Sequence, residues 1–182
     1  MRRLVFLMPL IVIVALVGTL AWPILEGRDP RQLPSVLLDK PIPAFELPGL
    51  MSGGPGLASA VFTGPDRLGK PALLNVFASW CAPCRLEIPR LAGLAAEGVA
   101  VYGLAYKDDP AATLGFLEQL GNPYHRIGVD RDGRVAIDFG VYGVPETYVI
   151  DAEGRIRHRH VGEITDQVAR ETLVPLLESL TR

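Results

Sequence analysis

The stretch Trp80-Cys81-Ala82-Pro83-Cys84 constrains this chain most, because it holds the only two cysteines in 182 residues. An apolar run, residues 72–78, comes directly before it, and a segment with helical spacing, residues 85–97, comes directly after it. This pattern predicts a buried strand, a short turn and a helix that begins at the cysteine pair.

A cysteine pair at the start of a helix is suited to redox chemistry. Unpaired backbone N–H groups and the positive end of the helix dipole favour the thiolate over the thiol. The thiolate is the form that attacks a disulfide. Cys84, one turn after Cys81, would lie close enough to attack a mixed disulfide, and Pro83 suits a first helical turn because it needs no N–H partner there. The pair therefore predicts dithiol–disulfide exchange.

Two other uses of the cysteines stay open. A zinc site would need a second ligand pair at suitable spacing, and only His158 and His160 lie close together in sequence. On a strand these two side chains point the same way, which fits a solvated edge strand as well as a metal pair. A permanent structural disulfide would close a very short loop and so stabilise the fold little. The pattern favours redox exchange, with no metal and no cofactor.

The N-terminus predicts a membrane anchor. Residues 4–22 contain no charge and follow Arg2 and Arg3. As a helix they would span roughly 28 Å, about the thickness of the hydrocarbon core, and the arginines would keep the N-terminus in the cytoplasm. A cleaved signal peptide is the alternative, but its apolar core would be shorter. We expect four parts, namely a cytoplasmic N-terminus, a signal-anchor helix, a linker and a domain, over residues 1–3, 4–22, 23–40 and 41–182.

The remaining sequence alternates between strand and helix patterns. Residues 51–66 are rich in Gly, Pro and Ser and predict a loop or an irregular hairpin. The order β-α-β-α-β-α-β-β-α predicts an α/β fold with a mixed central sheet and helices on both faces. The net charge of −2 gives no sign of nucleic-acid binding. The expected strands are residues 72–78, 99–105, 124–129, 147–151 and 155–161, and the expected helices are residues 87–97, 110–120, 134–139 and 166–180.

These motifs resemble the thioredoxin superfamily. Pro89 stands where thioredoxins carry a proline that kinks the helix after the cysteines. The segment Gly143-Val144-Pro145-Glu146-Thr147 resembles the loop whose cis-proline faces the cysteine pair in that superfamily. The resemblance implies a thioredoxin-like fold and a cis bond before Pro145.

A closer resemblance is to the CcmG/DsbE family, the membrane-anchored periplasmic thiol–disulfide proteins of cytochrome c maturation. It runs from about Pro41 to the C-terminus and is carried by five blocks, residues 75–81, 106–109, 120–124, 140–151 and 156–160. It implies a single-pass protein of the bacterial inner membrane whose domain faces the periplasm. It also implies a reductase that keeps the haem-binding cysteines of apocytochrome c reduced.

The resemblance also implies partners and roles. The client would be apocytochrome c or a cytochrome c maturation dithiol protein, and a membrane electron donor of the DsbD/CcdA type would recharge the pair. Cys81 would be the attacking thiol and Cys84 the resolving one. Val144 and Pro145 would shape the substrate groove, and Trp80 would either shield the site or simply pack beside it. We expect a monomer.

Two acidic residues near the site have open roles. Glu87 lies one turn after Cys84, and Glu146 follows Pro145. Many thioredoxins carry a buried aspartate where this chain has Asn75, so Glu87 is our candidate proton acceptor for Cys84. The two acids could instead form a negative rim that selects partners, and Glu87 could be an ordinary exposed helix carboxylate.

Two other functions remain as alternatives. A general thiol reductase that resembles the TlpA/ResA proteins would use the same cysteine chemistry on another client. A copper-site assembly protein would use the cysteines with a histidine, although such proteins usually have Cys-x-x-x-Cys spacing.

Overall fold

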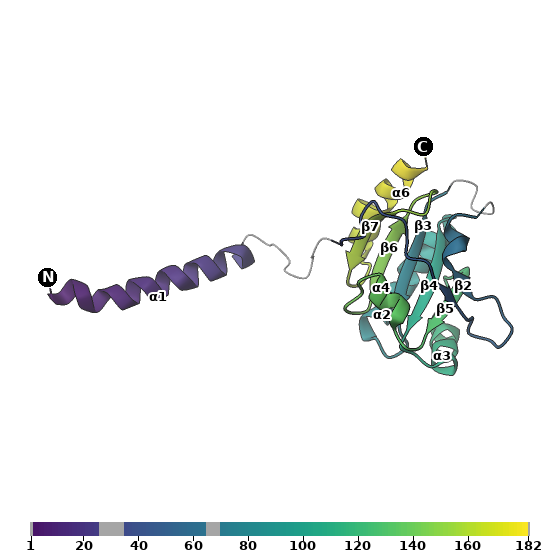
Figure 1. Cartoon of the computed structure of the whole chain (residues 1–182), viewed down its shortest axis with the longest axis horizontal. Coiled ribbons are helices and arrows are strands. Elements are labelled where there is room, and N and C mark those ends of the chain that lie inside the picture. Colours follow the sequence, from purple (N-terminus) through teal and green to yellow (C-terminus); the bar gives the residue numbers. More distant parts are fainter. Residues whose placement is uncertain (1, 26–34, 65–69, 182) are drawn as a thin grey trace. The chain divides into compact units, whose positions relative to one another are not determined.

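The computed structural model describes residues 2–25, 35–64 and 70–181, and it divides into two compact units, residues 1–33 and 34–182 (Figure 1). The first unit contains helix α1 (Arg2–Leu25), which confirms a helix over residues 4–22. The described side chains of α1, residues 8–22, are almost all exposed. Within the described parts of the chain, no helix is both long and apolar enough to cross a membrane. Residues 26–34 of the predicted linker lie outside the described residues.

The second unit is built on a five-stranded mixed sheet, as predicted. The strands lie in the order β5-β4-β3-β6-β7. Strand β3 is parallel to β4 and antiparallel to β6, while β4–β5 is parallel and β6–β7 antiparallel. The sheet consists of β3 (Ala72–Phe77), β4 (Ala100–Tyr106), β5 (Arg126–Asp130), β6 (Glu146–Ile150) and β7 (Ile156–Val161).

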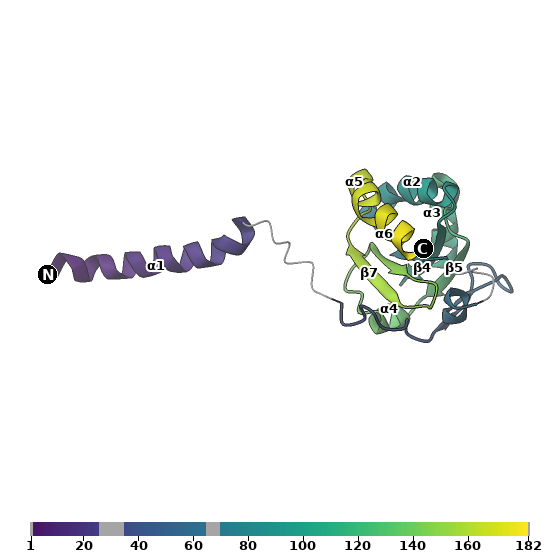
Figure 2. The same ribbon diagram turned by 90° about the horizontal axis from the view of Figure 1, so that it is seen from above.

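Helices cover both faces of the sheet, which Figure 2 shows from above. Side chains alternate along β3, so Leu73 and Phe77 pack on one face while Leu74 and Val76 pack on the other. The first face carries α2 (Ala82–Ala96), α3 (Pro110–Leu120) and the C-terminal helices. The second face carries α4 (Arg134–Asp138), a 3-10 helix (Ser59–Phe62) and the hairpin of β1 (Glu46–Leu47) and β2 (Leu57–Ala58).

A hairpin is present, but it spans residues 46–58 and overlaps the predicted segment 51–66 only in part, since residues 59–62 form a 3-10 helix. Its two antiparallel strands are β1 (Glu46–Leu47) and β2 (Leu57–Ala58). The hairpin packs on β5 at Gly128, where an added Cβ would lie 2.8 Å from Leu47 Cβ and 2.9 Å from Leu57 Cβ. A side chain at residue 128 would therefore push the hairpin off the sheet. Residues 65 and 66 of the predicted segment lie outside the described residues.

The helix predicted over residues 166–180 is interrupted by a π-helical turn. It consists of α5 (Asp166–Val168), a π-helical turn (Ala169–Leu173) and α6 (Val174–Leu180). Pro175 has no N–H, and its ring would clash with the carbonyl one turn earlier, so the wider turn accommodates it. The extra residue in the π-helical turn rotates the side chains that follow it about the helix axis. Ala169, Leu173 and Leu177 are buried, whereas Val168, Leu176 and Leu180 are only partly buried.

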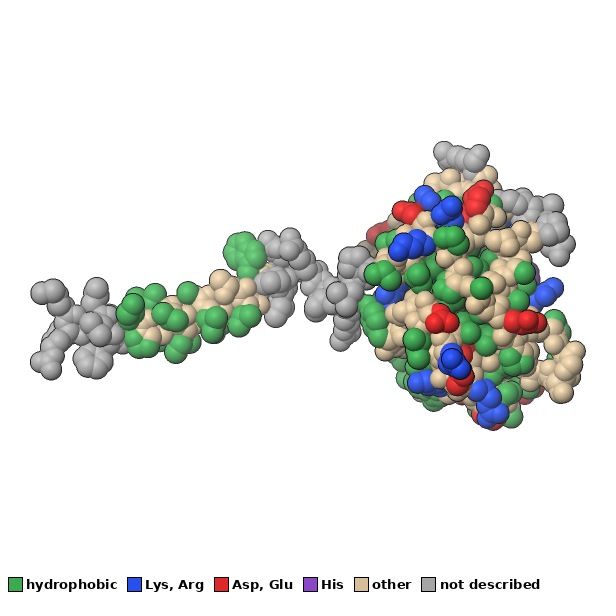
Figure 3. Space-filling view, viewed as in Figure 1, with side chains coloured by type: hydrophobic (Ala, Val, Ile, Leu, Met, Phe, Trp, Pro, Cys, Tyr) green, Lys and Arg blue, Asp and Glu red, His purple; other side chains and the backbone are tan. Residues whose placement is uncertain are grey.

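Charges of both signs are mixed on the face of the domain that Figure 3 shows. Figure 3 shows acidic and basic side chains interspersed with apolar ones over the visible face of the domain. This mixture agrees with the net charge of −2. A single-sign surface of the kind that binds nucleic acid is not seen on that face.

Candidate active site

Cys81 and Cys84 form a disulfide at the point where β3 passes into α2. Their Cα atoms are 5.3 Å apart. Cys81 is the N-cap of α2, with extended backbone, and its Sγ accepts a hydrogen bond from the Cys84 backbone N–H at 3.1 Å. Helix α2 begins at Ala82, which confirms that the helix starts at the cysteine pair, and its first turn precedes the range 87–97 that the apolar spacing predicted. Cys81 is 5% exposed and Cys84 is fully buried, so the N-cap sulfur is the more accessible one.

The turn before the cysteines is held by Asp108. Its Oδ2 accepts from the Ser79 backbone N–H at 2.6 Å, and its Oδ1 accepts from the Ser79 hydroxyl at 2.8 Å. Asp109 is the cap of α3, accepting from Ala111 N–H at 2.9 Å. Nothing in the local sequence pattern predicts the contact between Asp108 and Ser79, because the two residues are 29 positions apart.

Trp80 and Pro83 lie on the surface beside the disulfide. Trp80 is 60% exposed, and its indole N–H donates to the Lys107 carbonyl at 3.3 Å. Pro83 is exposed in the first turn of α2, as expected. Simple core packing therefore does not account for Trp80, whose ring edge is fixed while much of its surface faces solvent.

Glu87 is fully buried, so the interpretation as an exposed helix carboxylate is wrong. Its Oε1 accepts from Asn75 Nδ2 at 2.8 Å, and its Oε2 accepts from the Ile164 backbone N–H at 3.0 Å. Cys84 and Glu87 are three residues apart on α2 and so lie on the same side of the helix. The helix therefore places Glu87 beneath the cysteine pair, against the central strand.

Asn75 links Glu87 to a buried tyrosine. The Tyr124 hydroxyl donates to Asn75 Oδ1 at 2.7 Å, and Asn75 Nδ2 also donates to Thr147 Oγ1 at 3.0 Å. Burial raises the pKa of Tyr124, so its hydroxyl stays protonated at neutral pH and acts as a donor. Because the Tyr124 hydroxyl donates to the Asn75 side-chain oxygen, that oxygen faces Tyr124 and the Asn75 side-chain NH2 group faces Glu87.

Burial raises the pKa of Glu87 to about 7. Removal of the carboxylate from water favours the neutral form, and the two hydrogen bonds from Asn75 and Ile164 offset only part of this effect. No Lys or Arg contact is found for Glu87 among the described residues. The carboxyl can therefore gain or lose a proton near neutral pH.

The loop before β6 contains the predicted cis peptide bond, between Val144 and Pro145. Val144 is partly buried and packs against the core cluster that includes both cysteines. Pro145 itself is buried. The structure thus brings the cis-proline loop and the cysteine pair into one region of the molecule.

Glu146 is also fully buried, so it does not contribute to an exposed negative rim. Its Oε2 lies 2.8 Å from both Nε and Nη2 of Arg159 and accepts from the Tyr148 hydroxyl at 3.0 Å. Its Oε1 accepts from the Tyr142 backbone N–H at 3.2 Å. No local sequence pattern marks Arg159 as a partner of Glu146, because the register of the β6–β7 hairpin brings the two side chains together by pairing Arg159 with Tyr148.

The histidines of β7 lie on an edge strand, as expected. His160 contacts the Glu163 carbonyl through Nε2 at 3.1 Å, and both His158 and His160 are partly buried. Among the residues that the structure describes, no three His, Cys, Asp or Glu side chains are placed to hold a metal ion together.

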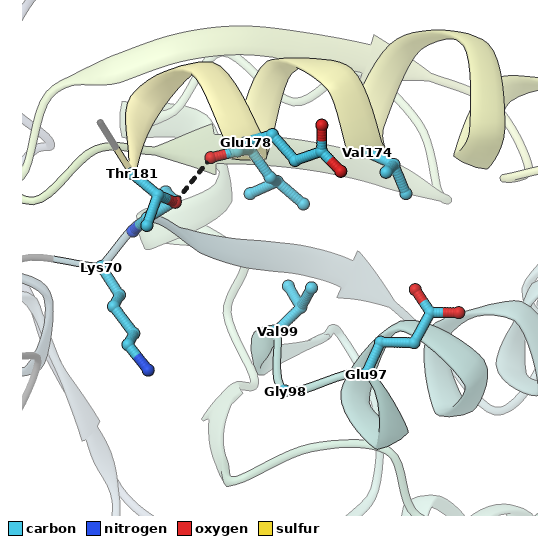
Figure 4. Close-up of a pocket in the computed structure, with 9 residues that line it drawn as sticks. Lys70, Glu97, Gly98, Val99, Val174, Glu178 and Thr181 are labelled. Atoms are coloured by element: carbon cyan, nitrogen blue, oxygen red, sulfur yellow. Dashed lines mark hydrogen bonds between the residues drawn. The ribbon is translucent and has the colours of Figure 1, made fainter.

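A pocket of about 250 Å³ lies at the other end of β3 from the cysteines (Figure 4). Val174 and Leu177 of α6 form one wall, and Val99 lies opposite. Glu97 and Glu178 stand at its edge. None of the predicted site residues lines this pocket.

Comparison with known proteins agrees with the geometry. The Redoxin family model matches residues 38–173. A thiol:disulfide interchange protein DsbE of Pseudomonas aeruginosa is 44% identical over 99% of this chain and 96% of its own length. DsbE of Escherichia coli K12 is 43% identical over 100% and 98%. The thiol:disulfide interchange protein HelX of Rhodobacter capsulatus is 40% identical over 97% of both chains.

Solved structures of thiol–disulfide proteins superpose on this chain and so have the same fold. A structure described as a thiol:disulfide interchange protein DsbE, from Chlorobium tepidum, superposes with a TM-score of 0.66 at 26% identity, covering 80% of this chain and 99% of that one. A thio-disulfide isomerase from Thermus thermophilus gives 0.61 at 28% identity, covering 80% and 97%. The chain therefore belongs to the Redoxin family and, within it, to the DsbE (CcmG) thiol:disulfide interchange proteins, and it is a thiol–disulfide oxidoreductase with a thioredoxin-like fold.

Proposed function

We propose that this protein is a membrane-anchored periplasmic reductase that keeps the haem-binding cysteines of apocytochrome c reduced during cytochrome c maturation. The observation that supports the chemistry best is the Cys81 N-cap, whose sulfur accepts the Cys84 N–H at 3.1 Å. The same N–H and the helix dipole would stabilise a Cys81 thiolate in the reduced protein. Membership of the DsbE family and the sequence blocks shared with it support the choice of client.

The proposed exchange has two steps. The Cys81 thiolate attacks one sulfur of the client disulfide, so the client S–S bond breaks, a mixed disulfide forms and a client thiolate leaves to take up a proton. Cys84 then loses its proton and attacks Cys81 Sγ, which releases the second client thiolate and forms the Cys81–Cys84 disulfide. Two electrons pass to the client, and the disulfide seen in the structure is the oxidised product.

Glu87 is the proposed proton acceptor for Cys84. Its pKa of about 7 lets the carboxylate accept a proton near neutral pH, and it lies one turn from Cys84 on the same helix. Val144 and Pro145 shape the proposed groove, in which an extended client segment would pair with the loop backbone. Trp80 lies at the surface beside this groove.

The proposed setting is a bacterial inner membrane. Residues 4–22 form a single-pass signal anchor, residues 1–3 stay in the cytoplasm and residues 23–40 link the anchor to a periplasmic domain. The support is the uncharged sequence and the exposed apolar side chains of residues 8–20. A DsbD/CcdA-type membrane donor would supply a dithiol that reduces the Cys81–Cys84 disulfide, and the protein would act as a monomer.

Trapping of mixed disulfides tests this function. The full-length Cys84→Ser variant, expressed in the membrane, lacks the resolving thiol and should retain its client on Cys81. Cys81→Ser is the matched control and should retain nothing. Apocytochrome c or a cytochrome c maturation dithiol protein on Cys84→Ser would support the proposal.

Other results would redirect or contradict the proposal. A different client, such as an oxidase subunit, would place the protein among the general TlpA/ResA-like reductases. Trapping by Cys81→Ser in place of Cys84→Ser would reverse the two roles. A stable stoichiometric copper complex of the reduced protein would favour copper-site assembly instead.

A further inference from the structure

A tight turn from Ala78 to Cys81 leads directly into the helix that carries both cysteines. The Cys81 backbone N–H donates to the Ala78 carbonyl at 3.2 Å, so Ser79 and Trp80 are the central residues of this turn. Cys81 is also the N-cap of α2, where its Sγ accepts from the Cys84 N–H at 3.1 Å. The conformation of the turn therefore decides where the Cys81 sulfur lies relative to the start of the helix.

Two consecutive residues directly after β4 contact both central residues of the turn. Asp108 accepts from the Ser79 backbone N–H at 2.6 Å and from the Ser79 hydroxyl at 2.8 Å. The Lys107 carbonyl accepts from the Trp80 indole N–H at 3.3 Å. Ser79 is thus held at its backbone and at its side chain, and Trp80 is held at the edge of its ring.

Asp108 is itself fixed by the start of α3. It is 6% exposed, and besides the two donors of the turn it accepts from the Asp109 backbone N–H and from the buried Thr113 hydroxyl, both at 2.9 Å. Lys107, directly before it, has a φ of 46°, a left-handed conformation that is uncommon outside glycine. Four hydrogen bonds to one carboxylate leave it little freedom to move, so Asp108 can hold the turn in one place.

These contacts matter most when the disulfide is reduced. In the oxidised protein the S–S bond ties Cys81 directly to Cys84. In the reduced protein this bond is absent, so the place of the Cys81 sulfur depends on the turn before it. A sulfur that stays at the N-cap keeps the Cys84 N–H and the positive end of the helix dipole, and both stabilise the thiolate.

We propose that Asp108 is a positioning residue for the sulfur exchange: it holds the turn from Ala78 to Cys81, so that the Cys81 sulfur stays at the start of α2 once the disulfide is reduced. The inference rests on the proposed role of Cys81 as the attacking thiol. The hydrogen bonds of Asp108 go to the turn and to the start of α3, so Asp108 acts on the sulfur through the turn.

Position and charge predict opposite effects for a change at Asp108. A carboxylate near a thiolate disfavours it by repulsion, so removal of the charge alone would make Cys81 more reactive. If the carboxylate holds the turn, its removal lets the sulfur leave the helix start and makes Cys81 less reactive. The direction of the change therefore separates the two roles.

The test measures alkylation of Cys81 by iodoacetamide in the reduced, full-length protein. Cys84→Ser serves as the background, because Cys81 is then the only thiol and the backbone N–H at position 84 is kept. Adding Asp108→Ala should slow alkylation at pH 7 about fivefold and move the midpoint of the rate-against-pH curve upward, because less of Cys81 is thiolate. A role in stability alone would leave both values unchanged while the protein is folded.

Asp109→Ala is the matched control, since Asp109 has the same charge and lies next in the sequence. The described contacts of its side chain are with Ala111 and Arg131, so alkylation should keep the rate of the background. Ser79→Ala is the second variant, in case Asp108→Ala does not fold. It removes the hydroxyl donor without a change of charge and keeps the backbone N–H, so it should slow alkylation about twofold.

Unchanged or faster alkylation in Asp108→Ala, or in Ser79→Ala if only that variant folds, would overturn the inference. An equal slowing in Asp109→Ala would also overturn it, because the effect would then come from the start of α3 as a whole. Failure of the proposed function gives a different result. The Cys84→Ser background would itself react at pH 7 no faster than glutathione, and Cys81 would then not be an activated thiol.

Discussion

Glu87 and Glu146 are both fully buried near the cysteine pair, but the protein surrounds them differently. Glu146 faces a cation, since two nitrogens of Arg159 lie 2.8 Å from its Oε2. Among the residues that the structure describes, the groups that donate to Glu87 are neutral, namely the Asn75 amide and the Ile164 backbone N–H. The charge of Arg159 neutralises the Glu146 carboxylate, whereas hydrogen bonds from neutral groups stabilise the Glu87 carboxylate.

This difference in surroundings suits the two carboxylates to different roles, since Glu146 can hold a loop in place and Glu87 can transfer a proton. A buried ion pair fixes its two side chains and whatever they contact, which for Glu146 and Arg159 is the cis-proline loop. A buried carboxyl without a cation has its pKa raised towards neutrality, as for Glu87 at about 7. A group with that pKa can exchange a proton with a thiol at physiological pH.

The largest expected effect is a loss of stability when the ion pair between Glu146 and Arg159 is broken. Arg159→Met removes the cation and leaves the Glu146 carboxylate buried, so we expect a loss of about 3–5 kcal/mol in the free energy of unfolding. Denaturant unfolding measures this loss. The double variant Glu146→Leu, Arg159→Met should recover much of it, because neither charge then remains.

A surface pair provides the control for this experiment. The Arg131 side chain is 68% exposed and pairs with Asp109, which is 57% exposed. Arg131→Met should therefore cost less than about 1 kcal/mol. Equal losses in Arg159→Met and Arg131→Met would show that burial does not distinguish the two pairs.

The next effect is on the pH dependence of stability. The pKa of Glu87 is raised from 4.5 to about 7 in the folded protein, so between these values the folded state binds more protons than the unfolded state. Glu87 therefore makes its full contribution to the free energy of unfolding below pH 4.5. This contribution falls by about 3 kcal/mol as the pH rises from 4.5 through 7. Glu87→Gln should remove this slope in the oxidised protein.

Denaturant unfolding at several pH values between 4.5 and 8 measures the slope. Glu97→Gln is the matched control, because Glu97 lies exposed at the C-terminal end of the same helix. It should keep the wild-type slope. An unchanged slope in Glu87→Gln would assign the pH dependence to another group.

The smallest effect concerns the hydrogen bond that orients Asn75. Tyr124→Phe removes the hydroxyl that donates to Asn75 Oδ1 at 2.7 Å and leaves this buried oxygen without that donor. We expect a loss of about 1–2 kcal/mol in the free energy of unfolding. With its oxygen no longer directed to Tyr124, the Asn75 amide is less firmly directed at Glu87, so the Glu87 pKa should rise further. A stability equal to that of the wild type would show that Tyr124 does not orient the amide.

The sequence predicted the sheet and the cysteine turn from local patterns, because a mostly apolar strand and a cysteine at a helix start each occupy few residues. The cis-proline loop was predicted from the resemblance of residues 143–147 to the corresponding loop of thioredoxins. The burial of Glu87 could also have been predicted from the sequence. Once the helix is taken to begin at Ala82, the spacing Cys84, Glu87, Ile88 and Leu91 places Glu87 on the apolar face.

The contacts that hold the site could not be predicted in the same way. Asp108 and Ser79 are 29 residues apart, and Tyr124 and Asn75 are 49 apart, so no periodicity connects them. Arg159 and Glu146 meet only through the register of β6 and β7, which the sequence does not specify. The π-helical turn before Pro175 likewise depends on how the last helix packs on the sheet.

The most direct measurement is a titration of the Glu87 side-chain carboxyl carbon by NMR in the oxidised, full-length protein. Glu87→Gln identifies the resonance by its disappearance. We expect a midpoint near pH 7, because burial raises the pKa of Glu87 and the described residues place no cation against its carboxylate. A midpoint near 4.5, the value of an unperturbed glutamate, would contradict it and would remove Glu87 as the proton acceptor for Cys84.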